Sequence, residues 1–343
     1  LVADTAPLVD LVDERAIDGV PMTFFEVMTA LAYEAFAQAP VDVAVVEVGL
    51  GGITDATNVM DAQVAVICPI DYDHTHLLGH TLTEIAGEKA GIIKAGSQVV
   101  LAAQHSEAAT VLIERSAEVG AKVYREGVEF GLRQRTPGVG GQLVRLDTAG
   151  GPVDDVLLPL FGAHMARNAA LAVAAVEAFL GGKPLAPDII TEALGQVQAP
   201  ARLEVVRRSP TVVLDTCHNP HGARATIDAL TEAFTFAPLI GVVAMMADKD
   251  VDGLLSIFAE EMTTIVCTTV AGTSRALSPE ALAERASGIF GEDRVRVASG
   301  LSDAIEAAVA LADEAGPGAG VLVAGSVIAA GQARALLVRE ERR

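Results

Sequence analysis

Short runs of β-branched and other apolar residues alternate with longer helix-like segments along most of the chain. Runs of this kind lie at residues 42–48, 64–67, 99–102 and 122–124, and the alternation starts again beyond residue 200. Strand–helix–strand units are right-handed and build parallel sheets that are covered by helices. The sequence therefore predicts an α/β protein, and its 343 residues favour two domains over one.

Two segments interrupt this alternation and suggest how the domains are divided. Glycine- and proline-rich turns within residues 126–160 predict a small antiparallel insert. Residues 198–201 (Gln-Ala-Pro-Ala) form the best linker candidate, because the strand–helix pattern restarts behind them. We expect one domain at 1–199 and a second at 200–343, while residues 1–22 carry no assignable pattern.

Composition excludes several classes of partner. The formal net charge of −21 argues against nucleic acid and anionic membranes, which require a basic surface. No apolar run reaches the roughly 18 residues that a membrane span needs. The cysteines Cys68, Cys217 and Cys267 form neither a zinc motif nor a disulfide framework, which predicts a reducing cytoplasm. The chain opens on Leu1 without an initiator methionine or signal peptide, which suggests a fragment.

Three ionisable residues follow one another at predicted strand ends and on the next helix. Glu47 closes an apolar run before a glycine-rich turn, and such a carboxylate is either a solvated acid or a magnesium ligand. His74 is either an ordinary loop histidine or a second ligand. Lys89 is either a helix-surface cation or a group near phosphate, which carbamylation by CO₂ would convert into an oxygen ligand.

Other candidates have an equally plain structural alternative. Asp55 could satisfy a turn or accept hydrogen bonds from an amino-bearing heterocycle. Arg202 could be a surface cation or a phosphate clamp, and Asp215 a helix cap or a ribose ligand. Ser326 could merely cap the last helix. The chain has no GxxxxGK[ST] phosphate-binding loop.

Taken together, five segments carry a family resemblance. They read VEVGLGG..DATNV, DYDHT..LG.TL.EIA.EKAGIIK, GAHMARNAALA, DTCHNPHGA and AGSVIAAGQAR. The chain resembles folylpolyglutamate synthase/dihydrofolate synthase, a family of Mur-ligase-like ATP-dependent amide ligases. This resemblance covers nearly the whole chain. It implies an N-terminal ATPase-type parallel-sheet domain that lacks its amino-terminal phosphate-loop segment, followed by a Rossmann-like C-terminal domain.

The resemblance also implies roles for individual residues. The metal ligands would be Glu47, His74 and carbamylated Lys89, and Lys89 and His218 would be catalytic. ATP would contact Asn168, Arg202 and Asp215, the substrates Thr23, Phe25, Asp55 and Ser326. ATP and Mg²⁺ are the implied cofactors, with room for a monovalent cation. The chain departs from the family pattern at Ile53 (arginine in the family), Ala201 (glycine) and Met165 (glutamine).

The resulting hypothesis is ATP-dependent addition of L-glutamate to dihydropteroate or folate through an acyl phosphate. Closure of two domains would exclude water from that intermediate. Two alternatives stay open: another Mur-type ligase acting on a peptidoglycan precursor, and a non-catalytic fragment without a phosphate loop. The resemblance further implies a monomer that works on small molecules.

Overall fold

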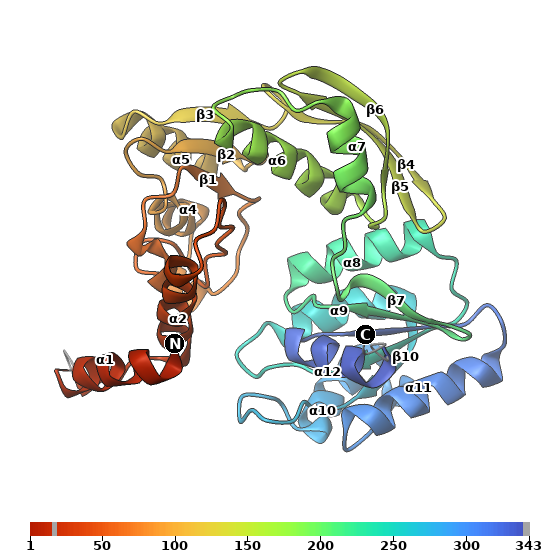
Figure 1. Ribbon diagram of the computed structural model, residues 1–343. Helices are drawn as coiled ribbons and strands as arrows, with labels where there is room; N and C mark the ends of the chain where they lie inside the picture. Colours follow the sequence, from red (N-terminus) through yellow and green to blue (C-terminus); the bar gives the residue numbers. More distant parts are fainter. Residues whose placement is uncertain (16–18, 339–343) are drawn as a thin grey trace. The chain divides into compact units, whose positions relative to one another are not determined.

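A computed structural model describes residues 1–15 and 19–338 of the chain (Figure 1). Its contacts divide the chain into two compact units, Leu1–Glu126 (unit 1) and Gly127–Arg343 (unit 2), each described here by itself. The sequence predicted a division after residue 199 instead. Compactness and family domains are different criteria, so the predicted domains 1–199 and 200–343 stay a prediction.

Unit 1 contains a three-stranded parallel sheet with strand order β1-β2-β3. Its elements in chain order are α1 (Val2–Glu14), α2 (Phe24–Gln38), the short 3₁₀ helix η2 (Ala56–Val59), β1 (Val64–Ile67), α3 (Thr75–Leu78), α4 (Leu82–Ala90), β2 (Gln98–Leu101), α5 (Ser106–Glu118) and β3 (Lys122–Arg125). The core joins inward residues of β1 and β2 to α4 and α5, including the fully buried Ile85, Val99 and Leu112.

The sequence has the form Thr-x-x-Glu at residues 23–26 and 81–84, which predicts capping boxes at two helix starts, and both boxes are confirmed. The Thr23 hydroxyl accepts the Glu26 N–H at 3.2 Å, and Glu26 in return accepts the Thr23 N–H at 2.7 Å. Thr81 and Glu84 make the same reciprocal pair at the start of α4. Each box satisfies two N–H groups that the first helical turn leaves without partners, so α2 and α4 begin where the sequence predicted.

The predicted buried strand at 42–48 is wrong. No strand among the described residues pairs with this segment, and its side chains Val43 and Val45 are 53% and 94% exposed. A β-branched run becomes a strand only when a neighbouring strand satisfies its backbone groups. The leading segment, which the sequence left unassigned, instead contains the helix α1.

Unit 2 begins with the antiparallel insert that the sequence predicted. Its strands β4 (Gly131–Gly138), β5 (Gly141–Thr148) and β6 (Gly151–Leu158) form a meander, with tight turns at the glycine-rich positions. Helix α6 (Ala163–Phe179) packs on β4 and β5, and α7 (Pro187–Gly195) packs on β6. This meander leads into the larger sheet of the unit.

The larger sheet has six strands in the order β11-β10-β9-β12-β8-β7. All neighbours are parallel except β7, which runs antiparallel to β8 at the edge. The elements are β7 (Arg202–Arg208), β8 (Thr211–Asp215), α8 (Pro220–Ala233), β9 (Leu239–Val243), α9 (Val251–Glu261), β10 (Met262–Cys267), α10 (Pro279–Phe290), η3 (Glu292–Arg294), β11 (Val295–Val297), α11 (Leu301–Ala315), β12 (Gly320–Ala324) and α12 (Val327–Leu337).

Helices cover both faces of this sheet. Residues of α8, α9 and α10 share one apolar cluster with the sheet, and residues of α11 and α12 share another. The loops behind β8 and β9 therefore lead to one face, while the loop behind the intervening β12 leads to the other. Ligands in open α/β sheets bind at such switch points, beside the carboxyl ends of the strands. Asp215 and Ser326 lie at these ends.

None of the helices described is long and apolar enough to cross a membrane.

Candidate functional site

The glycine turn after Glu47 lies directly on helix α4. Gly51 has φ +70°, which favours glycine, and a Cβ on Gly52 would lie 2.4 Å from the Glu88 carbonyl oxygen. The Ile53 N–H donates to that same carbonyl at 3.1 Å. Only residues without a side chain permit this approach of backbone to backbone. The turn is thereby held against the end of α4 that carries Lys89.

The charges of Glu47 and Lys89 act on the same thiol. Desolvation raises the pKa of Cys68, the negative charge of Glu47 raises it further, and the positive charge of Lys89 lowers it. A carboxylate and an amine from segments more than 40 residues apart are therefore neighbours of the carboxyl end of β1. The grouping of Glu47 with Lys89 at a metal site stays a prediction.

His74 occupies a strained backbone position. Its φ of 48° is left-handed, its N–H donates to the Asp73 carboxylate at 2.8 Å, and its Nε2 lies 3.8 Å from the same carboxylate. Within the described residues, no three His, Cys, Asp or Glu side chains gather closely enough to hold a metal ion. The role of His74 as a metal ligand therefore stays a prediction.

Asp55 holds the glycine turn in shape. Its carboxylate accepts the Leu50 N–H at 2.8 Å, and the N–H (3.0 Å) and hydroxyl (2.5 Å) of Thr57. Burial alone would raise the pKa of Asp55, but these hydrogen bonds and one from the Gly49 N–H outweigh it and lower the pKa. Asp55 thus accepts hydrogen bonds from the backbone of the turn, which is the structural alternative that the sequence offered for it.

Thr23 and Phe25 lie at the start of α2. The Thr23 hydroxyl is engaged in the capping box. The Phe25 ring is 43% exposed and lies so close to Gly49 that a Cβ on that glycine would be 2.5 Å from the ring. An aromatic face thus borders the glycine turn that Asp55 holds.

In unit 2, Asp215 connects β7 and β8. One oxygen, Oδ2, accepts the Leu203 N–H at 3.0 Å, and Oδ1 accepts the Cys217 N–H at 2.8 Å and the Thr226 hydroxyl at 2.9 Å. Asp215 is only 4% exposed. An ionised carboxylate has about four acceptor positions, so these three bonds leave one on Oδ2.

Arg202 is exposed between two buried residues, Ala201 and Leu203. It pairs in register with Asp215 across the two strands. Both Arg202 and Asp215 also act on His164: desolvation lowers the pKa of that imidazole, Asp215 raises it, and the charges of Arg202, His221 and Arg135 lower it. Three of the residues at the start of α6 and the ends of β7 and β8 therefore share one electrostatic environment.

The remaining predicted residues of unit 2 lie on neighbouring elements. His218 Nδ1 lies 3.1 Å from the Thr216 carbonyl oxygen in the loop before α8. Asn168 is exposed on α6, the helix that also carries His164. The Ser326 hydroxyl accepts the Ile328 and Ala329 N–H groups at 3.2 and 3.5 Å, so Ser326 is the cap of α12.

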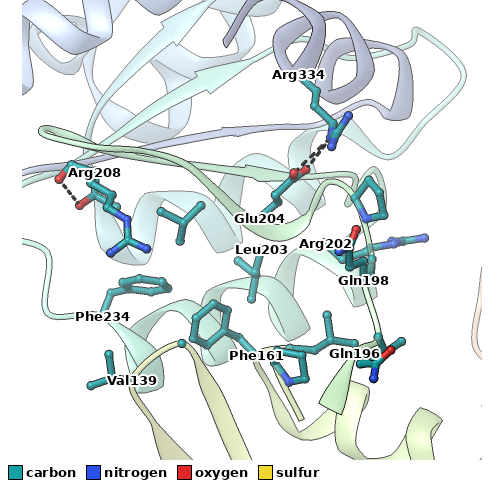
Figure 2. Close-up of a pocket in the computed structure, with 18 of the residues that line it drawn as sticks. Val139, Phe161, Gln196, Gln198, Arg202, Leu203, Glu204, Arg208, Phe234 and Arg334 are labelled. Atoms are coloured by element: carbon teal, nitrogen blue, oxygen red, sulfur yellow. Dashed lines mark hydrogen bonds and ion pairs between the residues drawn. The ribbon is translucent and has the colours of Figure 1, made fainter. Parts of the chain in front are cut away.

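A pocket of about 620 Å³ opens beside β7 (Figure 2). Phe161, Leu203 and Phe234 form its apolar side, and Glu204 pairs with Arg334 at one end. The Arg202 side chain also lines the pocket and extends away from Leu203 in Figure 2.

Sequence reasoning missed several polar residues of unit 2. His164 and Arg334 were quoted within motifs but given no role, and Glu204 was not considered at all. Thr216 was also missed: it is 7% exposed, and its hydroxyl has no hydrogen-bond partner in the described part of the chain. The position of Thr216 directly after Asp215 was the available signal. Glu204 and Arg334 are 130 residues apart, so no local pattern could have connected them.

Two family models match the chain: "Mur ligase middle domain" at residues 21–176 and "Mur ligase, glutamate ligase domain" at residues 201–327. The α/β fold with residues gathered at strand ends is therefore that of a Mur-type ligase. The dihydrofolate synthase/folylpolyglutamate synthase of Mycobacterium tuberculosis is 44% identical over 97% of this chain and 73% of its own length. The chain spans 61% of the folylpolyglutamate synthase of Lacticaseibacillus casei, which is 38% identical over 76% of this chain.

A solved structure of the M. tuberculosis folylpolyglutamate synthase, complexed with ADP and AMPPCP, matches with a TM-score of 0.93 and 45% identity. That match covers 98% of this chain and 78% of the other. The chain belongs to the dihydrofolate synthase/folylpolyglutamate synthase family. The predicted family and fold class are thus confirmed.

Proposed function

We propose that the intact protein joins L-glutamate to dihydropteroate or to a folate in an ATP-dependent amide ligation. A carboxylate oxygen of the acceptor attacks the γ-phosphorus of ATP, which forms an acyl phosphate and releases ADP. The glutamate amine then attacks the acyl carbon, the C–O bond to phosphate breaks, and the amine loses a proton. Phosphorylation is needed because a carboxylate has no adequate leaving group.

Family membership over 97% of the chain is the single observation that carries this proposal. The M. tuberculosis neighbour is a complex with ADP and AMPPCP, which supports ATP as the phosphoryl donor. Catalysis of phosphoryl transfer relies on positioning and charge neutralisation, so exposed cations and fixed carboxylates are the groups to expect. Both kinds of group are present at the strand ends of this chain.

In unit 1, Glu47 and Lys89 would hold Mg²⁺. Mg²⁺ typically takes one or two protein carboxylates and completes its shell with water and phosphate oxygens, which suits Glu47 together with carbamylated Lys89. Their shared effect on the Cys68 thiol supports this fit. When bound, Mg²⁺ neutralises phosphate charge. His74 would be a further ligand, and a monovalent cation would be accommodated here as well.

In unit 2, Arg202 would bind a phosphate group of the nucleotide through its exposed guanidinium. Asp215 would accept a ribose hydroxyl at the one Oδ2 position that its internal bonds leave open. Asn168 and His218 would contact the nucleotide from α6 and from the loop before α8.

Phe25 would face the pterin, because its half-exposed ring offers a flat apolar surface. Thr23 and Asp55 would complete that site while holding α2 and the glycine turn in place. Ser326, at the end of β12, would lie near the incoming glutamate. The partners are small molecules, and we place the protein in the cytoplasm as a monomer, which its free cysteines and acidic charge support.

The test is ADP release by the intact protein with ATP, Mg²⁺ and dihydropteroate or folate, measured with and without L-glutamate. The proposal predicts turnover that requires both the pteridine and glutamate. ADP release that depends on neither, or the absence of turnover despite tight pteridine binding, would reject it.

The role of Arg202 is tested by Arg202→Met, which removes a charged hydrogen-bond donor worth roughly 1.5–3 kcal/mol. We expect kcat/KM for ATP to fall about 10- to 100-fold. Arg208→Met is the matched control, because Arg208 is exposed at the other end of the same strand. Equal losses in the two variants would contradict a specific role for Arg202.

A further inference from the structure

Arg202 lies between two residues with unusual backbone geometry. Ala201 and Leu203 have φ values of 54° and 49°, in the left-handed region that residues with a side chain rarely adopt. Such positions persist only where surrounding contacts hold them, and they concentrate at functional sites. The left-handed position of Ala201 also explains why the family pattern has a glycine there.

Two carboxylates accept hydrogen bonds from the backbone of residues 201–203, called here the Ala201–Leu203 turn. The Ala201 N–H donates to Glu204 at 2.8 Å, and the Leu203 N–H donates to Asp215 at 3.0 Å. The Arg202 N–H donates to the Ala199 carbonyl at 3.1 Å. Three successive N–H groups are therefore fixed, and with them the direction in which the Cα–Cβ bond of Arg202 leaves the backbone.

Glu204 is itself held by a residue from the end of the chain. Arg334 on α12 donates its Nε to both Glu204 oxygens, at 3.1 and 3.0 Å (Figure 2). Both side chains are partly buried, with 31% and 24% exposure, so solvent screens the pair only in part. Helix α12 thus fixes the carboxylate that accepts the Ala201 N–H.

We propose that the Glu204–Arg334 pair is a positioning clamp. It keeps the backbone of Ala201 and Leu203 in the left-handed region and thereby aims Arg202 at the nucleotide phosphates. This inference rests on the proposed function for the part that concerns the nucleotide. The clamp supplies preorganisation: an arginine fixed before the ligand arrives loses less conformational freedom on binding. Glu204 and Arg334 act through Arg202 and need no contact with the nucleotide themselves.

The alternative is that the pair only ties α12 to β7. The two roles are separated by measuring AMPPCP binding with Mg²⁺ by calorimetry on the intact protein and its variants Glu204→Ala and Arg334→Met. The control is the Arg224–Glu260 pair of the same unit, which joins α8 to α9 through two hydrogen bonds of 2.6 and 2.5 Å. Its variants are Arg224→Met and Glu260→Ala.

The clamp predicts that Glu204→Ala and Arg334→Met each weaken AMPPCP binding about tenfold, and that the double variant is no weaker than the weaker single one. The control variants leave affinity within about twofold of the wild type. Adding Ala201→Gly to Glu204→Ala restores most of the lost affinity, because glycine enters the left-handed region without strain. A pair that only joined α12 to β7 would give no such rescue.

Hydrogen exchange of a peptide spanning residues 199–206 provides a readout that needs no nucleotide. Faster exchange in Glu204→Ala and Arg334→Met, but not in the control variants, is expected. Unchanged exchange overturns the clamp even if the protein binds no nucleotide, a result that would reject the proposed function separately. Faster exchange with unchanged AMPPCP affinity overturns the aiming of Arg202, and so does a loss of affinity that Ala201→Gly does not restore.

Discussion

Single residues at the two sites combine a structural task with a proposed functional one. The sequence identified Asp55 as either a turn residue or a ligand for a heterocycle, and the structure contains the turn contacts. Asp215 likewise bonds to its own fold through three groups and retains one acceptor position. A sequence pattern cannot separate such tasks, because the same carboxylate in the same place serves both.

Asp55 makes the stability of the protein depend on pH. Its pKa in the folded state lies below the ordinary value of 3.8, so its stabilising contribution is fully present above that value and is lost as the pH falls through the folded pKa. Asp55→Asn is expected to lower the free energy of unfolding by about 1–3 kcal/mol at pH 7. Denaturant titrations should show that the difference in free energy of unfolding between the wild type and Asp55→Asn narrows below pH 3.8.

Asp10 is exposed on α1, so Asp10→Asn serves as the control. Its free energy of unfolding should equal that of the wild type at every pH. A difference between wild type and Asp55→Asn that stays constant from pH 7 to pH 3 would contradict this account of Asp55.

Two glycines, Gly52 packed against helix α4 and Gly87 within it, give opposite expectations for a change to alanine. A Cβ on Gly52 would lie 2.4 Å from the Glu88 carbonyl and 3.1 Å from the Lys89 Cα, and backbone cannot yield there. Gly52→Ala should therefore destabilise by several kcal/mol and impair activity through Lys89. Gly87→Ala, within α4 and with open space around it, should stabilise by up to about 1 kcal/mol. Thermal unfolding of both variants tests these expectations. Equal shifts in melting temperature would contradict the close packing of Gly52 against α4.

At the scale of elements, the sequence predicted a helix correctly where the residues that start it lie within the same segment. The capping boxes at Thr23 and Thr81 place α2 and α4 because each box satisfies its own helix. The strand prediction for the run at 42–48 failed because a strand needs a pairing partner, and no strand of the described residues pairs with this run. Strand β7 was missed because its sequence, RLEVVRR, is polar for a buried sheet, and it is tolerated only as an edge strand.

The cap of α12 permits a test at this scale. Ser326→Ala should cost about 1 kcal/mol of stability, as should Ser278→Ala at the cap of α10. If Ser326 also lies near the incoming glutamate, only Ser326→Ala will raise KM for L-glutamate. Unchanged KM in both variants would restrict Ser326 to its role as a helix cap.

For the whole molecule, the alternation of strands and helices predicted the α/β class, and the conjunction of motifs identified the family. The order of the six strands was not predictable from spacing, because β12 lies between β9 and β8 in the sheet but far from both in the sequence. The pairing of Glu204 with Arg334 depends on that order. Distant contacts of this kind are what a single sequence conceals.

The central claim is that amide formation passes through an acyl phosphate. Dihydropteroate labelled with ¹⁸O in its carboxylate tests it most directly, with the released inorganic phosphate analysed by mass spectrometry after turnover by the intact protein. The account predicts one ¹⁸O in each phosphate, because the C–O bond of the acyl phosphate breaks when glutamate attacks. Unlabelled phosphate accompanying the amide product would contradict the claim.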